Sequence, residues 1–167
     1  MSLELHIFGE MLDDEQFKIA NLVSSYTKGE LGESPQMLPV TPEEIFGKYL
    51  GVVATKDGIF AGYVGATKPA LHNGLYMPEV GSLWVPKAYR KMGIAQAIVQ
   101  CISITLDVTG HIPYAFCNPL SSGVFKHANY EEAASDEIPA MAFLACASCP
   151  KKPINGCCDT VMKYGGK

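Results

Sequence analysis

The sequence predicts a mixed α/β domain with a mostly antiparallel sheet. Its 167 residues suit one domain, 1–167, that buries a single core. Apolar residues make up 48% of the chain and charged residues 18%, a balance that excludes a disordered or collagen-like chain. Sixteen glycines and eleven prolines imply many turns, which favours a sheet-containing fold over a helical bundle. The elements along the chain give the order β-α-α-β-β-β-α-β-α-β-β.

One strand and two helices are expected before residue 48. Residues 3–8 alternate weakly between apolar and polar side chains, which predicts a strand. Asp13 and Asp14 are good helix-capping residues, and apolar side chains follow from Ile19 at i, i+3, i+4 and i+7, the pattern of an amphipathic helix. The segment TPEE (41–44) has an N-cap threonine, a proline at the first helical position and a capping-box glutamate, so it opens a second, short helix.

A three-stranded antiparallel meander is expected next. β-branched and aromatic residues are dense in 50–54, 59–67 and 77–85. The segments KDG (56–58) and HNG (72–74) between them are signals of tight hairpin turns.

The last part of the chain predicts two helices and three strands. An amphipathic helix begins near Ile94, a strand covers 112–117 and a short helix covers 121–128. A strand over 140–146 and a weaker one over 158–164 would close the sheet as a hairpin.

Charge and hydropathy exclude several classes of partner. The formal net charge is −4 and no basic run occurs, so we expect no nucleic-acid binding. No apolar stretch approaches the roughly 18 residues that span a bilayer. The start, MSLELHIFGE, has neither a basic beginning nor a long apolar core, so we expect no secretory signal and a cytoplasmic location. The six cysteines are then expected as thiols or metal ligands.

The segment EVGSLWVPKAYRKMGIAQAIV (79–99) carries the strongest chemical signal. It begins a strand–helix–strand unit, 79–118, whose strands should be parallel with a right-handed crossover. Between its strand and its helix lies a turn, the RKMGIA turn, made of Arg90, Lys91, Met92, Gly93, Ile94 and Ala95. The first amides of a helix have no intrahelical acceptor, small residues let a phosphate approach them, and Arg90 and Lys91 add positive charge. The turn therefore predicts an anion site that suits a pyrophosphate, although neither a P-loop nor a GxGxxG motif is present.

The pattern R-x-x-G-x-A after this strand resembles the acetyl-CoA loop of the GNAT superfamily of N-acetyltransferases. A downstream stretch, CNP (117–119) followed by VFKHANY (124–130), is similar to the family's second motif, and the resemblance covers about 50–130. It implies a GNAT-like, mostly antiparallel twisted sheet of about six or seven strands with helices on both faces. It also implies acetyl transfer from acetyl-CoA to a primary amine by direct attack in a ternary complex. A non-catalytic CoA-binding or acyl-CoA-binding module, or sensor, is the alternative.

The resemblance implies where the cofactor would lie. The strand would pair with the pantetheine arm, the RKMGIA turn would hold the diphosphate, and a bulge would splay the strand from the one ending at Asn118. A backbone amide near Val85 would polarise the thioester carbonyl. The implied cofactor contacts are Leu83, Trp84, Val85, Arg90, Lys91, Met92, Gly93, Ile94, Ala95, Asn118 and Phe125.

Glu79 is the acid–base candidate, because many family members carry a glutamate on this strand and an amine must lose a proton before it attacks. An exposed strand glutamate and a salt-bridge partner are the open alternatives. Phe125 stands where the family often has a tyrosine that protonates the leaving thiolate, and phenylalanine cannot donate a proton. Water, Tyr89 or Tyr130 could take that role, and the change leaves the non-catalytic alternative open.

Four thiols fall within thirteen residues of sequence: Cys146, Cys149, Cys157 and Cys158. They could hold Zn²⁺ or remain thiols, and no metal ligand is assigned. The segments 27–45 and 145–158 are expected to frame the acceptor pocket. The expected partners are a small-molecule or peptide amine acceptor and, as an open alternative to a monomer, a second copy of the chain.

Overall fold

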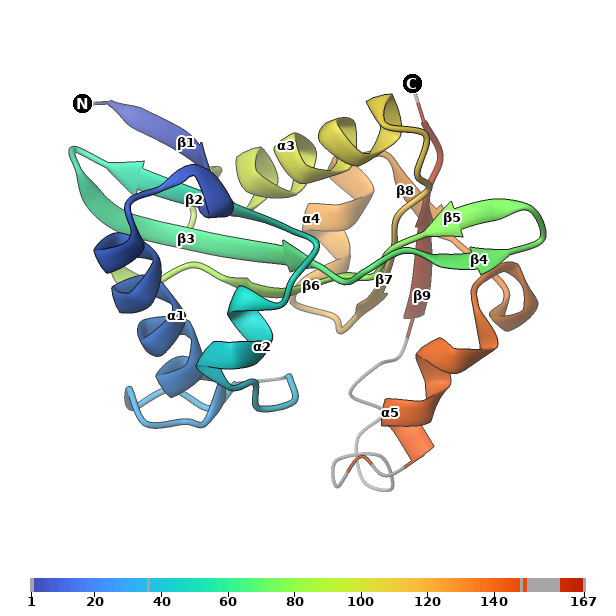
Figure 1. Cartoon of the computed structure of the whole chain (residues 1–167), viewed down its shortest axis with the longest axis horizontal. Coiled ribbons are helices and arrows are strands. Elements are labelled where there is room, and N and C mark those ends of the chain that lie inside the picture. Colours follow the sequence, from blue (N-terminus) through green and yellow to red (C-terminus); the bar gives the residue numbers. More distant parts are fainter. Residues whose placement is uncertain (1, 36, 148, 150–159, 167) are drawn as a thin grey trace.

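Two antiparallel sheets form the centre of the computed structural model, which describes residues 2–35, 37–147, 149 and 160–166 (Figure 1). The first sheet has the order β1-β2-β3-β6 and the second has the order β7-β9-β8. Their strands are β1 (Leu3–Ile7), β2 (Leu50–Lys56), β3 (Ile59–Ala66), β6 (Val80–Trp84), β7 (Tyr114–Cys117), β8 (Tyr130–Glu132) and β9 (Thr160–Tyr164). A separate hairpin of β4 (Ala70–His72) and β5 (Leu75–Met77) projects at one end of the molecule.

The two sheets meet where β6 begins. Glu79 bridges to Tyr114 and Tyr76 bridges to His111, both in the parallel sense, which confirms the expected parallel unit. Beyond these bridges β6 and β7 belong to different sheets, so the strands part. A bulge accompanies the separation: the pairs Tyr63–Trp84 and Gly65–Gly81 set one more residue on β6 than on β3.

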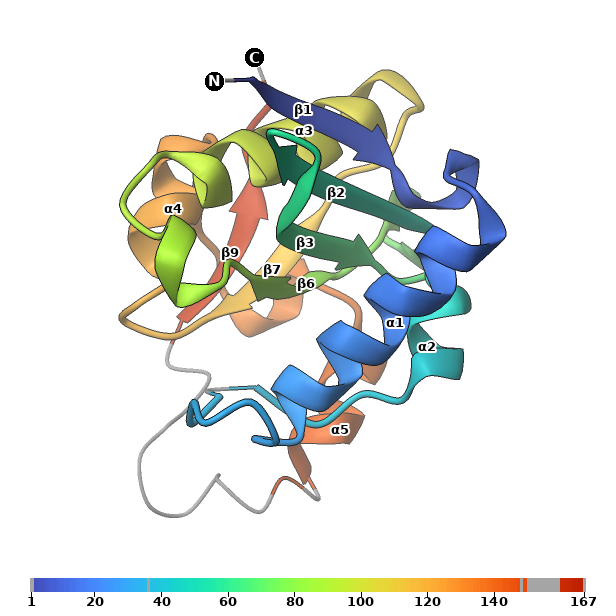
Figure 2. The same ribbon diagram turned by 90° about the vertical axis from the view of Figure 1, so that its left-hand side faces the viewer.

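Helices cover both faces of the first sheet, as expected. Residues at alternate positions of the strands face opposite sides: Val53 packs with α1 (Asp13–Thr27), whereas Val52 packs with α3 (Ile94–Val108). Figure 2 shows α1 and α3 on opposite sides of the strands. The remaining helices are α2 (Pro42–Phe46), α4 (Ser122–His127) and α5 (Leu144–Ala147). Short 3₁₀ turns lie at Phe8–Glu10, Lys87–Tyr89, Ser135–Glu137 and Ala140–Phe143.

The capping box predicted for α2 is present. The Glu44 amide donates to the Thr41 hydroxyl oxygen at 3.2 Å, and the Thr41 amide donates to the Glu44 carboxylate at 2.6 Å. Two orphan amide groups at the start of this helix are therefore satisfied reciprocally. None of the helices in the described ranges is long and apolar enough to cross a membrane.

The prediction of a strand over 140–146 is wrong. This segment forms a 3₁₀ turn and α5, since alanine, leucine and methionine favour helix and Pro139 directly precedes the turn. β9 instead pairs with β7 on one side and, on the other, with the three-residue β8, for which no strand was expected. The expected strand over 158–164 is described from Thr160 onward as β9.

The expected strand over 77–85 is also divided. Pro78 cannot donate to a ladder, and β5 ends before it while β6 begins after Glu79. The expected turn at Asn73 and Gly74, both with positive φ, closes the β4–β5 hairpin rather than a hairpin of the main sheet.

Candidate functional site

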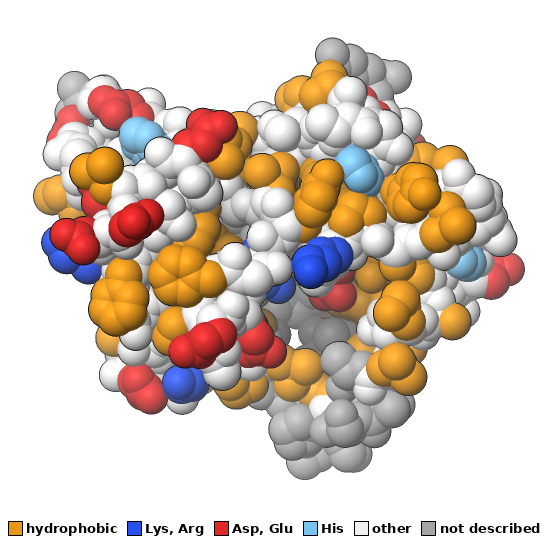
Figure 3. All heavy atoms as spheres, viewed as in Figure 1, with side chains coloured by type: hydrophobic (Ala, Val, Ile, Leu, Met, Phe, Trp, Pro, Cys, Tyr) orange, Lys and Arg blue, Asp and Glu red, His pale blue; other side chains and the backbone are white. Residues whose placement is uncertain are grey.

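A pocket of about 230 Å³ opens where β6 and β7 part. Figure 3 shows a hollow near the middle of this face, with a basic and an acidic side chain at its edge. The pocket, called the β6–β7 pocket below, is formed by β6, the end of β7, the loop before α2 and the segment around α5. Its lining residues are Met37, Leu38, Val40, Lys48, Thr67, Glu79, Val80, Gly81, Ser82, Phe116, Asn118, Ala142 and Cys146.

Glu79 lies in this pocket and is fixed through its backbone. The Thr67 amide donates to the Glu79 carbonyl at 2.9 Å, and the Glu79 amide donates to the Thr67 hydroxyl oxygen, also at 2.9 Å. Within the described residues, the Glu79 carboxylate takes part in no hydrogen bond or ion pair. Burial raises the pKa of Glu79, and the nearby positive charge of Lys48 partly offsets that effect. The site thus holds a shielded carboxylate that favours taking a proton near neutral pH more than an exposed glutamate would.

Lys48 is the charged residue of the pocket that the sequence analysis missed. It lies between α2 and β2, far from Glu79 in sequence, and no motif surrounds it. Burial lowers the pKa of Lys48, and the carboxylates of Glu79 and Glu44 counteract part of this shift. The pocket therefore carries one acidic and one basic side chain.

The RKMGIA turn leads directly into α3, as expected. Gly93 has φ +77° and is the N-cap of the helix, a left-handed conformation that glycine adopts without a steric penalty. Lys91 also has a positive φ, of 62°. The first amides of α3 therefore follow a tight turn without any N-cap side chain over them, the arrangement that suits an oxyanion.

Arg90 is engaged within the chain. Its Nε donates to the Val85 carbonyl at 2.9 Å, and its guanidinium forms an ion pair with Glu33 in the loop after α1. The net positive charge at the turn then rests on Lys91. The side chain of Met92 is exposed and accepts a hydrogen bond from Lys56 at its sulfur.

The strand β6 offers its backbone to the gap and its large side chains to the core. Trp84 stacks on Tyr26 of α1, with ring centroids 4.5 Å apart, so its indole faces away from the α3 side of the sheet. Leu83 and Val85 pack against the α3 core. Since β6 pairs with β3 on one side and leaves β7 after Glu79, one edge of the strand remains for a ligand.

Asn118 lines the pocket at the end of β7. Its Oδ1 accepts hydrogen bonds from the Leu120 and Ser121 amides, both at 2.9 Å. The side-chain carbonyl thus fixes the turn that leads into α4, while the side-chain nitrogen of Asn118, Nδ2, is available for other contacts.

Phe125 is buried in the main core and packs edge-on against Tyr130, with ring centroids 5.0 Å apart. The Tyr130 hydroxyl is buried and hydrogen-bonded to Ser103 of α3 at 2.8 Å, and burial raises its pKa. This geometry places Tyr130 in the core under α3. Within the described residues that line the β6–β7 pocket, there is no tyrosine.

The cysteine cluster is described only in part. Cys146 lines the pocket, which agrees with the expected position of this segment, whereas Cys157 and Cys158 lie outside the described residues. The described residues contain no group of side chains that could hold a metal ion.

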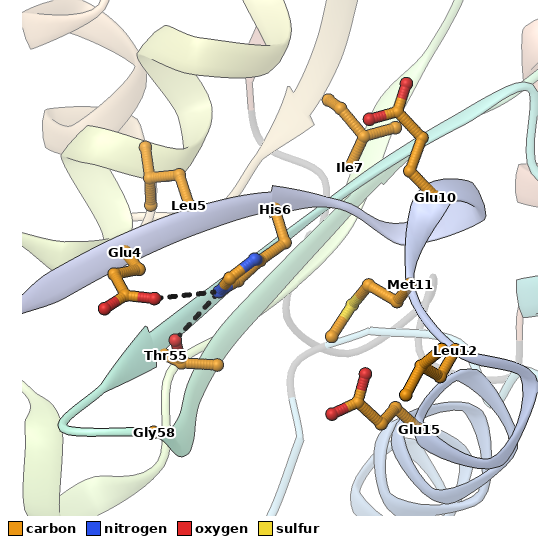
Figure 4. A pocket seen from close by; sticks show the side chains of 10 residues that line it. All are labelled: Glu4, Leu5, His6, Ile7, Glu10, Met11, Leu12, Glu15, Thr55 and Gly58. Atoms are coloured by element: carbon orange, nitrogen blue, oxygen red, sulfur yellow. Dashed lines mark hydrogen bonds and ion pairs between the residues drawn. The ribbon is translucent and has the colours of Figure 1, made fainter.

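A second pocket, of about 580 Å³, lies between β1 and the start of α1 (Figure 4). His6 contacts the Thr55 hydroxyl there at 2.9 Å. Three carboxylates line this pocket, those of Glu4, Glu10 and Glu15, and their charge disfavours a diphosphate. The β6–β7 gap is the better candidate for an anionic cofactor.

No protein-family model matches the chain, and no curated protein matches it. Solved structures share its fold at low sequence identity. A GNAT-family acetyltransferase from Staphylococcus aureus Mu50 is 14% identical, with a TM-score of 0.62 and 98% of each chain covered. N-acetylglutamate synthase from Neisseria gonorrhoeae, complexed with coenzyme A and N-acetyl-glutamate, is 14% identical with a TM-score of 0.66; the match covers 98% of this chain and 35% of that one. A GNAT-family N-acetyltransferase from Escherichia coli in complex with CoA is 19% identical with a TM-score of 0.53, over 77% of this chain and 68% of that one.

Proposed function

We propose that this chain, which has the fold of the GNAT N-acetyltransferases, transfers an acetyl group from acetyl-CoA to a primary amine. One observation carries the proposal: Glu79, a shielded carboxylate without a partner among the described residues, lies where β6 and β7 part. The other end of β6 leads to the RKMGIA turn. A base and an anion site are thus joined by one strand with a free edge.

The cofactor would lie along that strand. Its diphosphate would accept hydrogen bonds from the amides of residues 91–95, aided by the helix dipole and the charge of Lys91. Its pantetheine arm would follow the free edge of β6 past Leu83 and Val85, with Asn118 across the gap. Two solved structures that share the fold contain CoA, which supports CoA as the cofactor.

The reaction would proceed in a ternary complex without a covalent enzyme intermediate. Glu79 would accept a proton from the ammonium form of the acceptor, directly or through water. The free amine would then attack the thioester carbonyl carbon, the C–N bond would form, and the C–S bond would break with its electron pair leaving on sulfur. Amides of the bulged part of β6, residues 82–85, would stabilise the developing oxyanion. The attacking nitrogen would release its second proton to water as the amide forms, and the thiolate would take a proton from water, so that CoA leaves as the thiol. A thiol pKa near 8.5 makes the thiolate an acceptable leaving group.

A non-catalytic CoA-binding module is the second candidate. Phe125 favours it, because this position carries no proton donor and the ring is buried in the core. The two candidates differ in a single assay: the protein is incubated with acetyl-CoA and a pool of amines, and free thiol is followed. Thiol release well above the buffer rate, lost in Glu79→Gln, supports the enzyme. Release at the buffer rate together with stabilisation by CoA supports the binding module.

Both candidates require that CoA bind the folded chain. Acetyl-CoA or CoA at millimolar concentration should therefore raise the melting temperature by mass action. No shift with either ligand would contradict both. A cytoplasmic location and a one-domain organisation over 1–167 stay predictions.

A further inference from the structure

Two paired glycines lie on the sheet beside the charged groups of the β6–β7 pocket, and one of them, Gly81, lines the pocket. Gly65 of β3 lies opposite Gly81 of β6, so both lack side chains on the same face of the sheet. A Cβ added at Gly65 would lie 3.2 Å from Lys48 Cγ, and one added at Gly81 would lie 3.7 Å from Glu79 Oε1. Lys48, from the loop between α2 and β2, and Glu79, directly before β6, thus both approach the part of the sheet where side chains are missing.

The two charges are close enough to affect each other but are not joined. Each shifts the pKa of the other, yet the described residues form no ion pair or hydrogen bond with the Lys48 ammonium or with the Glu79 carboxylate. Both side chains are mostly removed from water, which is unfavourable for a charge without a partner. A ligand that brings a positive and a negative group would satisfy both.

A third polar group lies at the Lys48 end. Within the described residues, the buried Tyr63 hydroxyl has no hydrogen-bond partner, and it would lie 2.6 Å from a Cβ at Gly65. It therefore sits beside the Lys48 stem. Tyr63 is fully buried and is not among the residues that line the pocket, so the Lys48 ammonium is the donor that an acceptor group of a ligand, such as a carboxylate, would meet.

We propose that the acceptor is an amino acid, with its α-amine against Glu79 and its carboxylate paired with Lys48. This inference rests on the proposed acetyl transfer. The same pocket is also lined by the apolar side chains of Met37, Leu38, Phe116 and Ala142, which would receive an apolar side chain of the acceptor. A polyamine would instead bring a second positive charge toward Lys48 and is disfavoured by repulsion.

The test begins with a screen of the standard amino acids, their amides and simple alkylamines as acceptors in the thiol-release assay. For the best amino acid, kcat/KM is then compared with that of its own amide, in the wild type and in Lys48→Met, Lys48→Arg and Lys18→Met. The measurements are made as a pH series from 7 to 9. Loss of the Lys48 charge raises the pKa of Glu79 and would slow every acceptor at the lower pH, whereas burial lowers the pKa of Lys48, so that a high pH would remove its charge in the wild type. The ratio of the two kcat/KM values within each variant cancels any general damage to the base.

We expect Lys48→Met to lower the amino acid-to-amide ratio by about 10- to 100-fold, because a buried charge pair is broken. Lys48→Arg should retain most of the ratio, and Lys18→Met, an exposed change on α1, should leave it unaltered. With CoA saturating, the amino acid should raise the melting temperature of the wild type but not of Lys48→Met. An unchanged ratio in Lys48→Met, or transfer to alkylamines but to no amino acid, would overturn the inference while leaving acetyl transfer intact. Absence of thiol release with every acceptor would overturn the proposed function itself.

Discussion

Replacing Gly65 with alanine should destabilise the fold, because the space above this residue is already occupied. The new methyl group would lie 2.6 Å from the Tyr63 hydroxyl oxygen, 3.2 Å from Lys48 Cγ and 3.3 Å from Tyr63 Cζ. Tyr63 is fully buried and its ring packs against Phe8, so it cannot move aside freely. Overpacking of this kind typically costs about 1–3 kcal/mol, which for a chain of this size lowers the melting temperature by about 2–12 °C.

Gly81 provides the matched control, since it is the cross-strand partner of Gly65. A Cβ there meets its nearest atom, Glu79 Oε1, at the ordinary contact distance of 3.7 Å. Gly81→Ala should therefore change the free energy of unfolding by less than about 1 kcal/mol. Its methyl group would narrow the pocket beside Glu79, so its effect should be seen in KM for the acceptor.

A double variant isolates the cause. Tyr63→Phe removes the 2.6 Å contact and also removes a buried hydroxyl that has no hydrogen-bond partner in the described part of the chain, a change expected to be nearly neutral. Thermal and urea unfolding of the four proteins in the cycle should show that Tyr63→Phe recovers most of the stability lost in Gly65→Ala. If Gly65→Ala is as stable as the wild type, or if the effects of the two substitutions simply add in the double variant, the proposed crowding above Gly65 is refuted.

Three further predictions concern the site. Glu79→Gln should lower kcat by about 10²- to 10⁴-fold while the melting shift caused by CoA persists; unchanged turnover would remove Glu79 as the base. Burial raises the pKa of Glu79 above its ordinary value of 4.5, so folding disfavours the ionised form. The stability of Glu79→Gln relative to the wild type should therefore increase as pH rises from 4 through the folded-state pKa. Melting curves at pH 4 to 8 measure this difference, and a decrease with rising pH would contradict the prediction. Gly93→Ala places a side chain at φ +77°, so it should lower the stability of the fold by about 1–2 kcal/mol and weaken CoA binding. The control Gly123→Ala, at an open position in α4, should not destabilise the fold. Equal effects of the two changes on the CoA affinity measured by calorimetry would contradict the role of the turn.

Local signals predicted much of the fold. The capping box at residues 41–44 and the tight turn at 56–58 depend on neighbouring residues alone, and both are present. The RKMGIA turn likewise depends on one glycine with a positive φ at the start of a helix. The strand prediction for 140–146 failed because a short apolar run fits a strand or a helix equally well. The alanines and the leucine of this segment favour helix.

The composition of the pocket could be predicted only in part. Glu79 was named from the resemblance, because many family members carry a glutamate on this strand before the turn, and it lines the pocket. Lys48 was not named, because it meets Glu79 only through the pairing of β3 with β6 and the chain reversal before β2. Such contacts between distant segments leave no local pattern in the sequence.

The central claim is that CoA binds with its diphosphate on the first amides of α3 and its pantetheine along β6. Titration of the ¹⁵N-labelled protein with CoA, followed by amide chemical shifts, tests it most directly. We predict that the amides of residues 91–96 and 82–85 show the largest changes, with saturation at one CoA per chain. Changes concentrated between β1 and α1, or none at millimolar CoA, would contradict the account.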